Sequence, residues 1–331
     1  MSANGIGTNP RLAAATNSHR ISLQTNGDFT MHRNASILGK TLAAIIAVAG
    51  LLAVQTAMAA PSHAVSGLTR VTKVSASNSN TNKQVAAVCP AGKRVLGGGA
   101  EIVNGQGQVV LQQLQPRSTA TDDRFVAGAR EDGDGFAGAW RLRAFAVCAD
   151  PLAGQQIIAS TAPLSSDGQQ SLVGLCPTGQ REVGFGGKIN NGAGQVRLTD
   201  LYDFFGPPSS LLIVGAREDP DGYAGQWSLS SYTICADESA TDGFVLAGAL
   251  SPTNSQNKSV TVTCPAGTQV HTTGARLRVD QIGQTTSNAL VIDKVSVDPS
   301  LTSVTVRTVE DQNGTTGAWS VVAFALCAPP G

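Results

Sequence analysis

Short stretches of alternating apolar and polar residues follow one another from about residue 69 onward, separated by turns rich in Gly, Asn, Asp, Pro and Ser. A period of two residues predicts half-buried β-strands, because successive side chains on a strand point to opposite faces. No long stretch shows the period of an amphipathic helix. The pattern therefore predicts an all-β protein.

The predicted strands recur in three sets of about six, and each set ends with the same residues at the same offsets. A Glu-Asp pair precedes a Trp, and a Cys follows the Trp eight positions later. The three sets are Glu131, Asp132, Trp140, Cys148; Glu218, Asp219, Trp227, Cys235; and Glu310, Asp311, Trp319, Cys327. This periodicity predicts three homologous β-repeats at 67–150, 151–237 and 238–331.

Each repeat supports a strand-by-strand prediction. The first strand is predicted at 69–74, 156–160 and 244–249, and the second at 84–89, 171–176 and 259–264. The third is predicted at 95–102 and 183–189, the fourth at 108–114 and 195–201, and the fifth at 125–131, 211–218 and 304–310. The last covers 140–148, 227–235 and 319–327.

The last strand of each repeat carries apolar residues on both faces. In the first repeat Trp140 and Cys148 share one face, while Phe145 and Val147 lie on the other. A strand that is apolar on both faces is typically buried on both. We therefore expect the second face to pack against another repeat, so that the three units close around a pseudo-threefold axis.

Glycines interrupt the third strand, as in Gly97-Gly98-Gly99 and Gly184-Phe185-Gly186-Gly187. Glycine inside a strand indicates that another group approaches closely, and the recurring Trp is the neighbour we expect. A nucleotide-binding loop is disfavoured, because no helical pattern follows either segment.

Six cysteines occur, two in each repeat. The expected disulfides are Cys89 with Cys148, Cys176 with Cys235, and Cys264 with Cys327, since only pairing within repeats respects the internal symmetry. Each would close a loop that the chain-entropy model credits with roughly 4 kcal/mol. A structural zinc site is disfavoured, because a repeat offers two thiols and no recurring His.

The pattern of the N-terminal region is typical of an export signal. Residues 31–59 contain basic residues, an apolar run and a small-residue motif before Ala60, which predicts a signal peptide. Residues 1–30 are interpreted as a non-native or disordered extension, and 60–66 as the leader of the mature chain. The apolar run is short for a retained membrane anchor. We expect a secreted or periplasmic protein with no membrane span after processing.

Charge argues against nucleic acid as a partner. After Ala60 the chain has 19 Lys and Arg against 22 Asp and Glu. Binding to a phosphate backbone needs an excess of clustered basic residues.

The Glu-Asp pairs open turns that resemble part of a calcium-binding loop, with oxygen ligands at Asp132, Asp134, Asp219, Asp221, Asp311 and Asn313. The distal bidentate Glu of such loops is missing at the right spacing. The same residues suit an ordinary β-turn. We favour the structural turn and keep a weak calcium site as the alternative; no other cofactor is expected.

Catalytic constellations are poorly supported. Adjacent Glu131 and Asp132 would point to opposite faces of a strand, which does not suit glycoside hydrolysis. Histidine bases in the mature chain are limited to His63 and His271, and His271 occupies a position held by Leu96 and Val183 in the other repeats. An unrecognised hydrolase remains a minor alternative. Trp140, Trp227 and Trp319 are interpreted as structural aromatic residues, with a sugar-stacking role as the alternative.

The run Cys-Pro-Ala-Gly-Lys-Arg-Val-Leu-Gly-Gly-Gly-Ala at 89–100, with Trp140 and the Cys148-Ala149 pair, resembles a β-repeat module of secreted bacterial proteins. Such modules also occur in tandem or next to collagen-like segments. The resemblance implies a structural or adhesive role in display at the cell exterior, with an unknown protein or glycan partner. Carbohydrate binding of a lectin-like, calcium-assisted kind is the alternative. A pseudo-trimer within one chain predicts a monomer.

Overall fold

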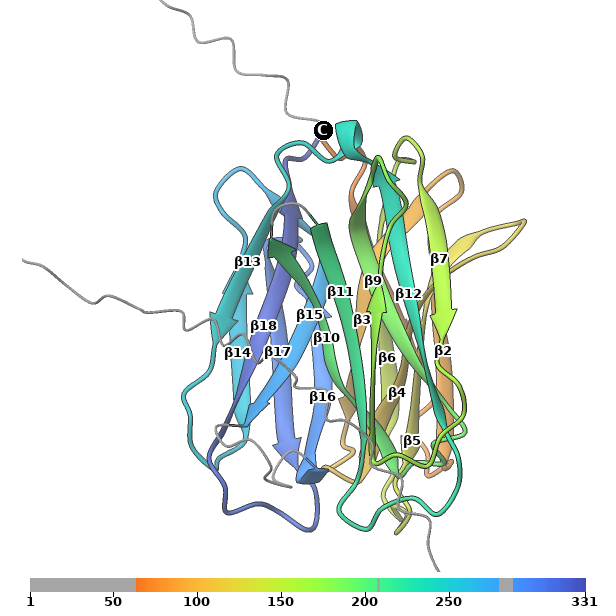
Figure 1. Ribbon diagram of the computed structural model, residues 1–331, viewed down its shortest axis with the longest axis vertical. Coiled ribbons are helices and arrows are strands. Elements are labelled where there is room, and N and C mark those ends of the chain that lie inside the picture. The colour runs from red at the N-terminus through yellow and green to blue at the C-terminus, as the bar shows by residue number, and fades with distance from the viewer. Residues whose placement is uncertain (1–63, 207–208, 280–287) are drawn as a thin grey trace, which may run out of the picture. The chain divides into compact units, whose positions relative to one another are not determined.

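The computed structural model describes residues 64–206, 209–279 and 288–331 (Figure 1). The predicted N-terminal extension, the signal peptide and most of the leader lie outside the described residues. Within the described part, the chain forms eighteen β-strands and one short 3-10 turn, η1 (Glu238–Ala240), and no α-helix. The predicted all-β class is confirmed. In these residues no helix is long and apolar enough to cross a membrane.

Each repeat supplies six strands, as the alternation pattern predicted. The first contains β1 (Thr69–Val74), β2 (Asn82–Val88), β3 (Arg94–Val103), β4 (Val109–Ser118), β5 (Asp123–Glu131) and β6 (Arg141–Ala149). The second contains β7 (Gln156–Thr161), β8 (Gln169–Gly174), β9 (Gln180–Asn190), β10 (Val196–Gly206), β11 (Ser209–Glu218) and β12 (Ser228–Asp237). The third contains β13 (Val245–Leu250), β14 (Lys258–Thr263), β15 (Gln269–Val279), β16 (Leu290–Val297), β17 (Ser303–Glu310) and β18 (Trp319–Ala328).

The strands form three six-stranded sheets, and every sheet joins three strands of one repeat to three strands of another. We call them sheet I (β1-β6-β3-β16-β17-β14), sheet II (β2-β5-β4-β9-β12-β7) and sheet III (β13-β18-β15-β10-β11-β8). A seam is the strand pair at which two repeats meet: β3 with β16, β4 with β9, and β10 with β15. In Figure 1 the long strands of these sheets run roughly along the vertical axis of the view, and neighbouring strands at the seams are antiparallel. The cyclic exchange of half-sheets is the predicted pseudo-threefold arrangement.

The three disulfides pair as expected, Cys89 with Cys148, Cys176 with Cys235, and Cys264 with Cys327. Each ties the end of the second strand of a repeat to its last strand. In the first repeat Trp140, Leu142, Ala144 and Cys148 are buried on the same side of β6. The core of each repeat therefore lies between two different sheets and is crossed by one disulfide.

The opposite side of the last strand contacts another repeat. Phe145 and Val147 of β6 are buried in a hydrophobic cluster whose other buried members come from the third repeat, among them Val270 and Val295. Apolar residues on both faces of the strand thus have two different neighbours, which confirms the expectation drawn from their alternation.

The expectation for the glycines was wrong. A Cβ atom on Gly99, Gly186 or Gly274 would meet the carbonyl oxygen of Val295, Leu114 or Leu201, respectively. Each contact crosses a seam, from the third strand of one repeat to the fourth strand of the repeat before it, the third repeat standing before the first in this cycle. These glycines therefore allow backbones of neighbouring repeats to approach, and no Trp ring is among their nearest neighbours.

A second set of close approaches surrounds the pseudo-threefold axis. Leu96, Val183 and His271 are each the extra residue of a β-bulge, and all three are fully buried. Nδ1 of His271, in the third repeat, lies 2.9 Å from the carbonyl oxygen of Val183 in the second repeat. Burial lowers the pKa of His271 to about 3. This histidine is a neutral packing residue and is inaccessible as a base.

Candidate functional site

The Glu of each predicted turn holds the Trp that follows nine residues later. Oε1 of Glu131 accepts a hydrogen bond from Nε1 of Trp140 at 2.9 Å. The equivalent distances are 3.0 Å for Glu218 with Trp227 and 3.4 Å for Glu310 with Trp319. All three indoles are fully buried. The recurring spacing therefore reflects a buried hydrogen bond, and these rings offer no surface on which a sugar could stack.

The first Asp of each turn points inward, toward a single arginine. Asp132, Asp219 and Asp311 are all buried, as is Arg197. Nη1 of Arg197 donates to Oδ2 of Asp311 at 2.9 Å, and Nη2 lies 3.9 Å from Oδ2 of Asp219. Burial raises the pKa of Asp219 to about 6, while attraction by Arg197 opposes that rise. A guanidinium therefore already supplies positive charge to these carboxylates.

The other proposed calcium ligand of each turn, two residues after the buried Asp, does not point toward Arg197. Asp134, Asp221 and Asn313 are exposed at the tips of the turns. Asp219 and Asp311 each accept a hydrogen bond from a backbone N–H two residues later, as a structural turn requires. Among the described residues, no group of three His, Cys, Asp or Glu side chains is arranged to hold a metal ion. A calcium site at these turns stays a prediction.

The second repeat contains a buried carboxyl pair whose electrostatics are strongly perturbed. Glu182 and Asp203 are 1% and 2% exposed. Burial, followed by the charge and hydrogen bond of Asp203, raises the pKa of Glu182 to about 9. Oε1 of Glu182 also accepts a hydrogen bond from the backbone N–H of Leu212 at 3.3 Å. Since neither carboxyl group reaches the surface, the pair forms no catalytic cleft.

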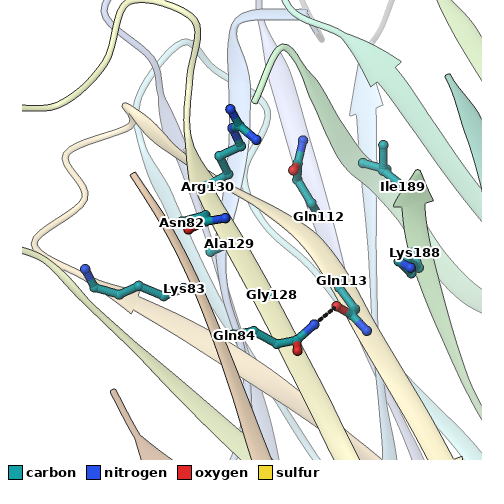
Figure 2. Close-up of a pocket in the computed structure, with 10 residues that line it drawn as sticks. All are labelled: Asn82, Lys83, Gln84, Gln112, Gln113, Gly128, Ala129, Arg130, Lys188 and Ile189. Carbon is teal, nitrogen blue, oxygen red and sulfur yellow. Dashed lines mark hydrogen bonds between the residues drawn. The ribbon is translucent and has the colours of Figure 1, made fainter. Parts of the chain in front are cut away.

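A polar hollow lies on the outer face of sheet II, over the seam between the first and second repeats. We call it the seam groove. Its volume is about 280 Å³. Figure 2 shows its lining, which comes from β2, β5, β4 and β9: Asn82, Lys83, Gln84, Gln112, Gln113, Gly128, Ala129, Arg130, Lys188 and Ile189.

One row of paired residues forms the middle of the groove. Gln84, Gly128, Gln113 and Lys188 are direct neighbours on four successive strands. Their side chains share a face, because paired positions on adjacent strands point the same way. Gly128 has no side chain, and the side chain of Gln113 lies over it: a Cβ atom on Gly128 would be 3.0 Å from both Cβ and Oε1 of Gln113. Nε2 of Gln84 donates to Oε1 of Gln113 at 2.7 Å above this glycine.

Two cations border the row. Arg130 lies two residues beyond Gly128 on β5, paired with Asn82. Its Nε is buried and has no hydrogen-bond partner in the described part of the chain. Lys188 comes from β9, across the seam. Neither cation pairs with a carboxylate of a described residue.

The equivalent positions on sheet I are filled by charged residues that form ion pairs with one another. Glu101 and Lys294 face each other across that seam, 3.3 Å apart, and Arg143 binds the same carboxylate at 2.6 Å. Arg307 occupies the position of Gly128 and pairs with Asp293 at 2.8 Å. At the seam of sheet I, each of these three cations therefore pairs with a carboxylate.

Sheet III keeps a glycine at this position but fills the space with an acid. Asp200 lies across the seam from Arg276, at 3.8 Å, and its carboxylate is beside Gly215. Burial raises the pKa of Asp200, with Thr199 and Arg276 opposing that rise. At the seam of sheet II the equivalent positions hold Lys188 and Gln113, and the lining of the groove contains no acidic residue.

Sequence reasoning missed every residue of the seam groove. Its members are ordinary polar residues far apart in the chain, and no local motif marks them. A comparison of equivalent positions could have found the signal, since Glu101, Lys188 and Arg276 occupy one register position and differ in charge. That comparison needs the pairing of repeats, which the sequence pattern did not provide.

Comparison with known proteins identified no relative of this chain. No protein-family model matches the chain, and no curated protein matches it.

Proposed function

We propose that this protein is an exported, non-enzymatic interaction protein of the bacterial cell exterior or periplasm, and that the seam groove is its binding site. The observation that carries the proposal is the difference between three equivalent seams. In sheets I and III the cation at the seam pairs with a carboxylate across it, Lys294 with Glu101 and Arg276 with Asp200, whereas Lys188 of sheet II has no such partner among the described residues and borders a hollow. A charge left without a partner over a hollow is a common feature of ligand sites.

The disulfides support the location. Three disulfides with no free cysteine in the described residues are typical of proteins from oxidising compartments. Export itself rests on the signal-peptide pattern of residues 31–59.

The lining supports binding without turnover. Apart from two lysines and an arginine, the groove offers amides and aliphatic groups. Its lining contains no carboxylate, imidazole, thiol or hydroxyl that could act as a nucleophile or general base at neutral pH.

The test is a glycan and envelope-fraction array probed with the full chain, expressed with its own N-terminal segment into a bacterial periplasm, with and without calcium. The double variant Arg130→Gln/Lys188→Gln serves as the groove knockout. We expect at least one ligand whose binding depends on these two cations. Binding that is identical in both proteins, or no binding to any class of ligand, would contradict the proposal.

Carbohydrate binding is the specific form of this function that the lining favours over protein binding. Asn82, Gln84, Gln112 and Gln113 each carry both a donor and an acceptor. Sugar hydroxyls need both. The array experiment separates carbohydrate binding from protein binding. If the groove binds carbohydrate, the double variant should lose binding to glycans on the array.

A further inference from the structure

We infer that the seam groove recognises a sugar acid, a ligand that combines a carboxylate with several neighbouring hydroxyl groups. The inference rests on the proposed function and specifies its ligand class. It follows from three features of the groove: its charge, the geometry of Arg130, and the chemistry of the amides between the two cations.

Charge selects an anion. Arg130 and Lys188 both border the groove, and its lining holds no acid. At the corresponding seam of sheet I, Glu101 stands where Lys188 stands here. In sheet I this position therefore supplies a carboxylate, Glu101, to the neighbouring cations. In sheet II it holds Lys188, and the carboxylate is missing. A ligand carboxylate would restore the missing negative charge.

Arg130 is the group best suited to hold that carboxylate. A guanidinium presents a planar fork of N–H donors that matches the two oxygens of a carboxylate. The guanidinium of Arg130 forms no ion pair with a carboxylate of a described residue, so its charge remains available to a ligand. Its strand neighbour Asn82 adds an amide at the same end of the groove.

The amides suit hydroxyl groups. Gln84 donates to Gln113, and Nε2 of Gln113 donates to Oε1 of Gln115 at 2.5 Å. This chain fixes which end of each amide faces its neighbour, and it leaves the Oε1 of Gln84 and further N–H groups available to a ligand. Inorganic phosphate would use the donors alone. A neutral sugar would leave both cations without a counter-charge.

Distance and size agree with a ligand of one or two sugar rings. Arg130 and Lys188 stand two strands and two residues apart, which places their Cα atoms roughly 12 Å from each other by standard sheet spacing. The volume of about 280 Å³ is at the small end of ligand sites. The carboxylate would lie at Arg130, the hydroxyls along the amides of Gln84 and Gln113, and Lys188 would meet a second polar group.

The test is calorimetric titration of the full chain, at low ionic strength, with galacturonate and its dimer. The matched ligands are galacturonate methyl ester, which removes the charge and keeps the shape, galactose, and inorganic phosphate. We expect galacturonate to bind at least about tenfold more tightly than its methyl ester, and at least about tenfold more tightly than phosphate. An ester or phosphate that binds as well as the acid would overturn the inference.

Three variants locate the site. Arg130→Gln should weaken binding of the acid by about tenfold, and Lys188→Gln should weaken it less and reduce its salt dependence. Arg217→Gln is the matched control, because Arg217 occupies the position of Arg130 in the second repeat. Loss of binding in the control equal to that in Arg130→Gln would overturn the assignment.

The two levels of the argument fail separately. If the array shows another ligand that depends on Arg130 and Lys188 while the uronates do not bind, the sugar-acid inference is overturned and the groove remains a binding site. If no ligand depends on the groove, both are overturned. Thermal unfolding of each variant beside the parent protein shows whether a loss of binding comes from the side chain or from unfolding.

Discussion

Several buried charged or titratable side chains occur in one repeat only, at positions that are apolar in the others. Glu182 takes the position of Val95 and Val270, which are both fully buried. His271 takes that of Leu96 and Val183. A buried polar group costs free energy unless it finds a partner. Here each has one, because Glu182 hydrogen-bonds Asp203 and His271 contacts the carbonyl of Val183.

The buried Glu182 should make the protein less stable in mild alkali. Its pKa is about 9 in the folded protein, against an ordinary value of 4.5. The folded state therefore keeps a proton that the unfolded chain has lost. This contribution to stability is complete below pH 4.5 and is lost as the pH rises toward 9, with a slope of at most about 1.4 kcal/mol per pH unit. Urea unfolding between pH 6.5 and 9 measures it.

Glu182→Gln is the matched variant, since it keeps the shape and a hydrogen-bond donor but does not titrate. We expect its free energy of unfolding to vary less over this interval than that of the parent protein. Equal slopes for the two proteins would show that Glu182 does not hold the proton.

The hydrogen bond between Glu131 and Trp140 should contribute measurably to stability. In Glu131→Ala the buried indole N–H loses the partner it has in this structure, which we expect to cost about 1–3 kcal/mol in the free energy of unfolding. Glu131→Gln keeps an acceptor and should cost less. Urea unfolding followed by tryptophan fluorescence provides the measurement.

The second repeat offers an internal control for this bond. Nε1 of Trp227 also donates to the carbonyl oxygen of Asp167, at 3.1 Å. Glu218→Ala should therefore be milder than Glu131→Ala. A larger effect for Glu218→Ala would mean that the indole bond is not what the glutamate contributes.

Among the strands, the seam glycines set how closely two repeats can approach. Gly186→Ala would place a Cβ atom against the carbonyl oxygen of Leu114 in the neighbouring repeat. Because both groups are backbone or attached to it, neither can rotate away. We expect a loss on the order of 3 kcal/mol in the free energy of unfolding.

Gly248→Ala is the matched change in a strand that has room. A Cβ atom there has its nearest neighbours at 3.6 Å, an ordinary contact, and we expect a change of less than about 1 kcal/mol. Chemical unfolding of both variants gives the comparison. Similar effects at the two positions would refute the role assigned to the seam glycines.

The strands themselves could be predicted from the sequence, because alternation and turn residues are local signals. The disulfide pairing followed from the repeat. The neighbours of the strand glycines could not be predicted, since Gly99 meets Val295 across nearly two hundred residues. Periodicity reports which face of a strand is buried, but it does not report which strand of which repeat covers that face. The seam groove was missed for the same reason.

Taken together, the three repeats share their sheets, so no repeat should be stable alone. Residues 67–150 without the others would lose the partners of β3 and β4, namely β16 and β9. We expect this fragment to be unfolded as a monomer and to contain ordered β-structure only when it forms trimers. Light scattering combined with circular dichroism tests this. A folded monomeric fragment would contradict it.

The intact chain supplies all three repeats that the three shared sheets require. It should therefore run as a monomer, and light scattering of the same preparation reports this directly. A stable trimer of the full chain would contradict the internal pseudo-trimer as the complete assembly.

The two ends of the described chain meet. The N–H of Val65 donates to the carbonyl oxygen of Pro329 at 2.8 Å, and Gly331 donates back to Val65 at 3.1 Å. The repeats also exchange half-sheets in a cycle, so the point at which the chain begins and ends could be moved to another connection between repeats without changing the fold. A circular permutant that begins near Gln155 and joins residue 331 to residue 64 through a short linker should form the same three sheets and disulfides. The linear order of the repeats would then be a record of how the gene was assembled rather than a requirement of the structure.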